Sequence, residues 1–140
     1  MLRPVFPANS LALVLYSSKV RAGFPSPADD HTDGELDLNE LVVRRPAATF
    51  YARAEGDSMR DAGIFDGDLL VVDRSLRPDH GDIVVAVLNG CLTVKRVSRS
   101  GSRWFLASAN PAYPSVPIPE DDECLVWGVV TFSLRQHCAR

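Results

Sequence analysis

The sequence predicts a mainly β protein with a strongly coiled, barrel-like sheet. Three observations predict this fold. Short apolar runs of strand length follow one another after residue 48, residues typical of tight turns separate them, and helical periodicity is scarce. The chain has 140 residues, which is enough for one hydrophobic core but not for two.

The predicted strands show two patterns. In residues 49–54 the apolar side chains alternate, so that Phe50, Ala52 and Ala54 share one face. The runs DLLVVD and DIVVAVL are continuously apolar, which is typical of strands that are buried on both faces. The run VVTFSL near the C-terminus alternates again, through Val130, Phe132 and Leu134.

The Asn89-Gly90 pair is the strongest turn signal in the chain. Both central residues of a type I′ hairpin turn need positive φ, which asparagine and glycine tolerate. If the residues that flank this pair close the loop, Lys95 lies opposite Val84. Lys95 would then stand among apolar neighbours, on the same face as Ala86, Thr93 and Val97.

The first 46 residues differ in composition from the rest of the chain. Residues 1–35 combine an apolar run at residues 11–16 with a polar stretch at residues 28–35 and the prolines Pro4, Pro7, Pro25 and Pro27. This composition is typical of a mobile arm. Residues 36–43 fit either a short helix or an extended strap. We therefore expect an N-terminal arm over residues 1–46 and a β domain over residues 47–140.

Charge and hydropathy exclude several classes of protein. The net charge is -3 and no window approaches the roughly 20 apolar residues of a membrane helix. We therefore expect no membrane partner and no direct sequence-specific DNA binding. The densest basic run is interpreted as a solvated hairpin edge; it contains Lys95, Arg96, Arg99 and Arg103.

The cysteines and the acidic residues indicate no metal site. The cysteines are odd in number and lack ligand spacing, which indicates a reducing cytoplasm and small apolar packing roles; they are Cys91, Cys124 and Cys138. Asp66, Asp68 and Asp73 lack the spacing of a calcium loop and are expected to set turns. No cofactor is expected. The three histidines, His31, His80 and His137, could supply a Ser/His/Asp triad. However, the residues around His80 are typical of an ordinary turn.

Lys95 is a candidate general base. The chain has 13 arginines and only two lysines, Lys19 and Lys95. Apolar surroundings penalise the charged form of a lysine and lower its pKa, and a neutral amine can accept a proton, which a guanidinium cannot do in a protein. The alternative is a structural lysine whose head group reaches water.

Ser58 is the candidate nucleophile. It lies between Gly56 and Gly63 just after a predicted strand, where a turn can expose a hydroxyl and direct backbone N–H groups at an oxyanion. The alternative is that Asp57 or Ser58 merely caps one helical turn.

These motifs resemble the LexA and UmuD group of self-cleaving Ser/Lys peptidases. The resemblance rests on GDSM around Ser58, the run GIFDGDLLVVD and TVKRV around Lys95, and it covers about residues 22–132. AGFPSPA at residues 22–28 and LDLNELV at residues 36–42 are most similar to UmuD-type proteins. Too few residues precede them for a helix-turn-helix domain, which argues against a LexA-like repressor. A LexA-like repressor fragment remains an alternative.

The resemblance implies a fold of the LexA C-terminal and signal peptidase type. It also implies that Ser58 is the nucleophile, that Lys95 is the general base, and that the backbone N–H groups of Asp57 and Ser58 form the oxyanion hole. The cut would fall between Ala22 and Gly23. Relatives often have cysteine before the cut, and the small Ala22 stands there instead. Pro25 and Pro27 favour the extended conformation of a peptide that adds to a sheet edge.

The implied partners are a second copy of the chain, a RecA filament on single-stranded DNA that stimulates cleavage, and a UmuC-like Y-family polymerase. The implied role is damage-response mutagenesis in the cytoplasm. Two other functions remain open: a non-enzymatic dimeric binding module that regulates a polymerase, and a general peptidase that acts on other chains. A signal peptide is disfavoured because the apolar run at residues 11–16 is short and Lys19 and Arg21 interrupt it.

Overall fold

The computed structural model describes residues 10–17, 20, 32–118 and 124–140. The chain divides into two compact units, Met1–Arg44 and Arg45–Arg140. The Ala22–Gly23 bond lies outside the described residues, so the function of residues 1–46 as a cleavable arm stays a prediction. No helix in the described ranges is long and apolar enough to cross a membrane.

The first unit contains a β-hairpin followed by one helical turn. Strand β1 (Ala12–Tyr16) pairs antiparallel with β2 (Thr32–Asp37), and helix α1 (Leu38–Val42) follows directly. Asp37 caps α1, because its carboxylate accepts the Asn39 N–H at 2.9 Å. Residues 36–43, for which a helix and an extended strap were both open, therefore end a strand and continue as a helix.

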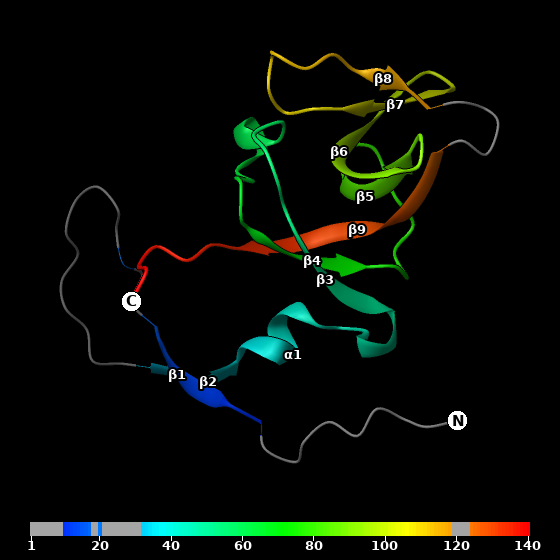
Figure 1. The fold of residues 1–140 in the computed structure, drawn as a ribbon. Coiled ribbons are helices and arrows are strands. Elements are labelled where there is room, and N and C mark those ends of the chain that lie inside the picture. Colours follow the sequence, from blue (N-terminus) through cyan, green and yellow to red (C-terminus); the bar gives the residue numbers. More distant parts are fainter. Residues whose placement is uncertain (1–9, 18–19, 21–31, 119–123) are drawn as a thin grey trace. The chain divides into compact units, whose positions relative to one another are not determined.

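The second unit is a seven-stranded antiparallel sheet, which confirms the mainly β class (Figure 1). Its strand order is β3-β4-β9-β5-β6-β7-β8. Neither a closed nor a strongly curled sheet was found in the described part of the chain, so the barrel-like coiling stays a prediction. The strands are β3 (Thr49–Arg53), β4 (Leu69–Asp73), β5 (Ile83–Leu88), β6 (Cys91–Ser100), β7 (Arg103–Ala107), β8 (Val116–Pro117) and β9 (Cys124–Leu134), and short 3-10 helices lie at Pro46–Ala48 and Arg60–Ala62.

The register predicted for the β5–β6 hairpin is confirmed. Lys95 pairs with Val84, and Leu88 pairs with Cys91 across the turn. Asn89 and Gly90 both have positive φ, of 51° and 77°, as a type I′ turn requires. This turn therefore determines which strand residues lie beside Lys95.

Strand β5 is buried on both faces, as its continuous apolar run predicted. Val84 and Ala86 belong to a core cluster with Val97, Leu106 and Val129. Val85 points to the other face and joins a second cluster, which also contains Ala54, Met59, Ile64, Leu70 and Val72. The second cluster includes the residue that follows Ser58, so the core supports the turn that carries this serine.

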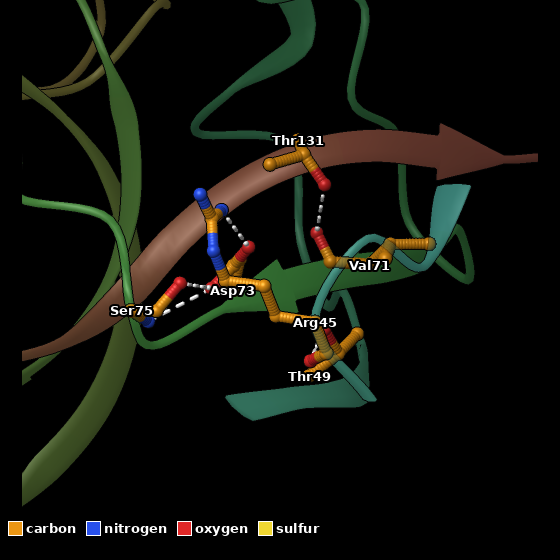
Figure 2. Close-up of polar contacts among 6 residues, drawn as sticks. All are labelled: Arg45, Thr49, Val71, Asp73, Ser75 and Thr131. Atoms are coloured by element: carbon orange, nitrogen blue, oxygen red, sulfur yellow. Dashed lines mark hydrogen bonds and ion pairs between the residues drawn. The ribbon is translucent and has the colours of Figure 1, made fainter. Parts of the chain in front are cut away.

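Strand β9 contains two β-bulges, and side chains satisfy the carbonyl groups near them. Thr131 is the extra residue of one bulge, and its hydroxyl donates to the Val71 carbonyl at 3.3 Å (Figure 2). Trp127 is the extra residue of the other, and its carbonyl accepts the Arg74 Nε–H at 3.3 Å.

The buried carboxylate of Asp73 connects the end of β4 to the segment that leads into β3 (Figure 2). It accepts hydrogen bonds from the backbone N–H and the hydroxyl of Ser75, at 2.8 and 2.5 Å, and the Arg45 guanidinium lies 3.5 Å away. The Ser75 hydroxyl is the main reason that the pKa of Asp73 is lowered. Asp73 therefore acts at a turn, as predicted.

Phe132 and Leu134 alternate with polar residues near the end of β9 as an inward face would, but their exposed fractions are 37% and 56%. One expectation about packing was wrong. Cys91 and Cys138 are exposed free thiols, so neither is a small apolar core residue.

Gly128→Ala is expected to destabilise the fold by about 1 to 3 kcal/mol. A Cβ at Gly128 in β9 would lie 2.7 Å from Val72 Cγ1 and 3.0 Å from the Asp73 carbonyl oxygen. Val72 is fully buried and has no room to retreat. Urea unfolding of the two proteins measures the difference. Ser133→Ala, on the exposed part of the same strand, is the control and should unfold like wild type; equal stability of Gly128→Ala would contradict the close approach.

Candidate functional site

Ser58 lies in a turn that connects β3 to the short 3-10 helix Arg60–Ala62. We call residues 56–63 the Ser58 turn. Gly56 and Gly63 bound it with φ of +87° and +79°, which explains the glycines, and the Gly56 N–H donates to Asp66 Oδ1 at 2.8 Å. The helical residues are preceded by Met59, and no side chain caps them. The interpretation of Asp57 or Ser58 as a helix cap is therefore wrong.

A cavity of about 410 Å³ adjoins Ser58. Residues 52–56 line one side of it, residues 92–94 of β6 line another, and Met59, Ile64 and Val85 complete the wall. Ser58 is partly buried and forms no hydrogen bond within the described chain. Its hydroxyl and N–H are therefore free to contact a group that enters the cavity.

The cavity lies between two stretches of strand that lack a neighbour on one side. Among the described strands, β3 pairs only with β4. Residues 91–95 of β6 pair with β5 but lie beyond the β7 ladder, which begins at the pair Arg96 and Ala107. Free backbone N–H and C=O groups on such edges can pair with an added extended peptide.

Lys95 is partly buried on β6, and its amine forms no ion pair with any described acidic residue. Nζ donates a hydrogen bond to Ser108 Oγ at 2.7 Å and lies 5.7 Å from the centre of the Tyr113 ring. Burial lowers the pKa of Lys95 below its ordinary value of 10.5, and no charged neighbour contributes to the shift. Its surroundings thus favour the neutral amine.

The segment at residues 108–113 joins Lys95 to the Ser58 turn. Tyr113 presents its ring to Lys95 and donates its hydroxyl to Asp57 Oδ1 at 2.8 Å. Asn110 is buried and donates from Nδ2 to the Asp57 carbonyl at 2.9 Å. The hydrogen bond to Asp57 raises the pKa of Tyr113, so its hydroxyl remains a donor at neutral pH. Sequence reasoning missed Ser108, Asn110 and Tyr113.

Tyr113 therefore contacts both Lys95, through its ring, and the Ser58 turn, through its hydroxyl. Within the described chain, however, no hydrogen bond joins Lys95 to Ser58, because the amine bonds Ser108 instead. Their roles as base and nucleophile stay predictions, as does the oxyanion hole at Asp57 and Ser58. The scissile residues Ala22 and Gly23 lie outside the described residues.

The other titratable candidates have structural contacts. His80 is exposed and accepts the Arg99 N–H at 2.9 Å, and His31 lies outside the described residues. Asp66, Asp68 and Asp73 each accept a backbone N–H near a turn, as predicted, from Gly56, Phe65 and Ser75. In the ranges that the structure describes, no three His, Cys, Asp or Glu side chains are grouped to hold a metal ion.

Comparison with known proteins identifies the class. Residues 14–131 match the peptidase S24-like family, and the chain belongs to that family. The chain is 51% identical over 117 residues to protein SamA of Salmonella typhimurium strain LT2. This alignment covers 84% of the chain and 81% of SamA. The chain is also 46% identical over 127 residues to protein MucA of Escherichia coli. This alignment covers 90% of the chain and 86% of MucA.

Within the family, the chain is a UmuD-like protein. The LexA repressor of Bordetella avium strain 197N is also similar, with 36% identity over 134 residues. That match covers 96% of this chain but only 62% of the repressor. The resemblance stated from the sequence is therefore confirmed at the level of the family and of the UmuD-like type.

Proposed function

We propose that this protein cuts its own chain between Ala22 and Gly23, with Ser58 as nucleophile and Lys95 as general base. The observation that carries the proposal is the arrangement around Tyr113. The partly buried Lys95, whose pKa is lowered, lies over the Tyr113 ring, and the Tyr113 hydroxyl donates to Asp57 in the Ser58 turn beside the cavity. Membership of the peptidase S24-like family supports the same chemistry.

The proposed substrate is an extended segment of the same chain or of a partner copy. The free edges of β3 and of residues 91–95 could hold such a segment by backbone hydrogen bonds on both sides of the cavity. Small side chains line the wall at Ala52, Ala54 and Gly56, which suits a small residue such as Ala22 before the cut. Gly23 leaves the far side of the scissile bond unobstructed.

The reaction would proceed by acyl transfer. The Lys95 amine turns toward Ser58 while it keeps its hydrogen bond to Ser108, and it accepts the hydroxyl proton while Ser58 Oγ bonds to the Ala22 carbonyl carbon. Backbone N–H groups at Asp57 and Ser58 stabilise the oxyanion. The C–N bond to Gly23 then breaks and the leaving amine takes the proton from Lys95. Water attacks the remaining ester, again with Lys95 as base, and releases residues 1–22.

The trimmed protein is proposed to act as a homodimer in the cytoplasm, in SOS translesion synthesis with an error-prone Y-family polymerase. The likeness to UmuD-like proteins supports a role in SOS mutagenesis. We also propose that a RecA filament on single-stranded DNA stimulates the cut. We propose that the filament favours entry of the scissile segment into the cavity, because Ser58 has no bound partner before then.

The test is intact-mass spectrometry of the purified full chain after incubation at alkaline pH, and at neutral pH with and without RecA filament. Wild type should lose its first 22 residues, and Ser58→Ala should remain whole in every condition. Ser102→Ala, in the exposed turn between β6 and β7, is the matched control and should be cut like wild type. An intact wild-type chain in all conditions would leave only a non-enzymatic binding module, and cutting of Ser58→Ala would exclude Ser58 as nucleophile.

A further inference from the structure

We propose that Ser108 is a positioning residue for Lys95: its hydroxyl anchors the Lys95 amine beside the Ser58 turn and orients the lone pair that accepts the serine proton. The proposal rests on the self-cleavage proposed above. It assigns a role to a residue that no motif in the sequence indicated, and it begins from the hydrogen bond of 2.7 Å between Lys95 Nζ and Ser108 Oγ.

The register of the sheet explains why Ser108 is available to Lys95. The β6–β7 ladder ends at the pair Arg96 and Ala107, and one further step in the same register places Ser108 opposite Lys95. Val84 is opposite Lys95 on the other side, in β5. Residues opposite one another in a sheet point to the same face. Lys95 therefore lies between the fully buried Val84 and Ser108, the residue that directly follows β7.

The chemistry of a neutral amine makes this contact useful. The Lys95 side chain has four flexible methylene groups, so an unanchored amine would occupy many rotamers and seldom face Ser58. A neutral amine has two N–H bonds and one lone pair. When one N–H donates to Ser108 Oγ, the amine can pivot about this contact, and we propose that this rotation directs the lone pair at the Ser58 hydroxyl. Loss of an anchor of this kind costs rate through orientation.

The same contact affects the protonation of Lys95. Ser108 Oγ can also accept a hydrogen bond from the charged ammonium form of Lys95. This bond favours the charged form, whereas burial disfavours it, so the bond partly offsets the effect of burial on the pKa. The other groups that face the amine are few. Strand β5 presents Val84 and has no titratable side chain, while the segment after β7 presents the Tyr113 ring with Asp57 behind its hydroxyl. Neighbouring Arg96 alternates to the other face of β6.

The test compares Ser108→Ala with wild type in self-cleavage at a series of pH values. Two changes are expected together. The limiting rate at high pH should fall roughly tenfold to a hundredfold, because the amine is less well oriented. The midpoint of the pH–rate curve should move to lower pH. The ammonium form of Lys95 loses the hydroxyl that accepts its hydrogen bond, while burial still disfavours the charge. Ser108→Thr keeps a hydroxyl and should restore both values, and Ser100→Ala, exposed at the end of β6, should change neither.

A second measurement does not depend on cleavage. Lysine labelled with ¹³C at Cε gives only two side-chain signals, from Lys19 and Lys95, and their assignment follows from Lys95→Arg. In a Ser58→Ala background, Ser108→Ala should shift the Lys95 titration to lower pH and leave Lys19 unchanged. An unchanged titration, or a limiting rate equal to or above wild type, would overturn the role of Ser108. If wild type fails to cut itself, the titration still tests the contact, so the two failures are distinguishable.

Discussion

Lys95→Arg is expected to abolish self-cleavage, with a loss of at least about a thousandfold in rate. Arginine keeps the positive charge and much of the length of lysine, but its guanidinium does not deprotonate in proteins. It therefore cannot accept the Ser58 proton at any pH at which the chain stays folded. Intact-mass spectrometry at alkaline pH measures the fraction of chain that has lost residues 1–22.

The rate of self-cleavage of wild type should depend on pH in the way that a lysine base predicts. Only the neutral amine is a base, so the rate should rise with pH and level off once Lys95 is deprotonated. Because burial lowers the pKa of Lys95, this plateau should begin at a lower pH than an exposed lysine would give. Arg96→Lys, the neighbouring residue on the other face of β6, is the control and should cut normally. Appreciable cutting of Lys95→Arg or of Lys95→Ala would show that another group is the base.

Asp68→Ala is expected to destabilise the fold by about 3 kcal/mol and to lower the Tm by roughly 10 °C. Asp68 is 1% exposed and accepts two hydrogen bonds of 2.8 Å from the Arg135 guanidinium and one of 2.9 Å from the Phe65 N–H. We take the low end of the range for a broken buried pair because the Arg135 side chain is 36% exposed and partly screened by water. Thermal unfolding at pH 7 measures the change.

The contribution of Asp68 to the stability of the fold should decrease at low pH. The Arg135 hydrogen bonds lower the pKa of Asp68 below its ordinary value of 3.8. Its contribution to stability is therefore complete above about pH 4, and it is lost as the pH falls through the lower folded pKa. The stability difference between wild type and Asp68→Asn should shrink below pH 4. Asp61→Ala, in an exposed ion pair with Arg60, is the control, and a similar loss of stability there would contradict the special role of Asp68.

The local parts of the fold were predictable because short-range chemistry determines them. Asn89 and Gly90 determine the turn, and the turn determines the register that places Lys95 beside Val84. Continuous apolar runs predicted burial of β5 on both faces. The alternation that suggested an inward Phe132 was misleading, because burial depends on what covers a strand from elsewhere in the chain, and strand periodicity carries no such information.

Sequence patterns indicated Ser58 and Lys95, whose roles stay predictions, but they did not indicate the residues that lie between these two. Ser58 and Lys95 stand in recognisable local contexts, whereas Ser108, Asn110 and Tyr113 lie in a segment without periodicity. Asn110 and Tyr113 contact Asp57 from more than fifty positions away in the sequence. Only the continuation of the β6–β7 register beyond Ala107 could have indicated that Ser108 meets Lys95.

The free edge of β3 exposes the protein to unwanted association. A row of unpaired backbone donors and acceptors can join two molecules into a continuous sheet, which is a common first step of aggregation. Two exposed charged residues lie at the end of this strand: Arg53 is its last residue, and Glu55 follows two positions later. Charged side chains beside an edge strand disfavour the addition of a second strand, because their head groups would lose contact with water. These two residues therefore reduce the tendency of the β3 edge to pair with another copy of the chain.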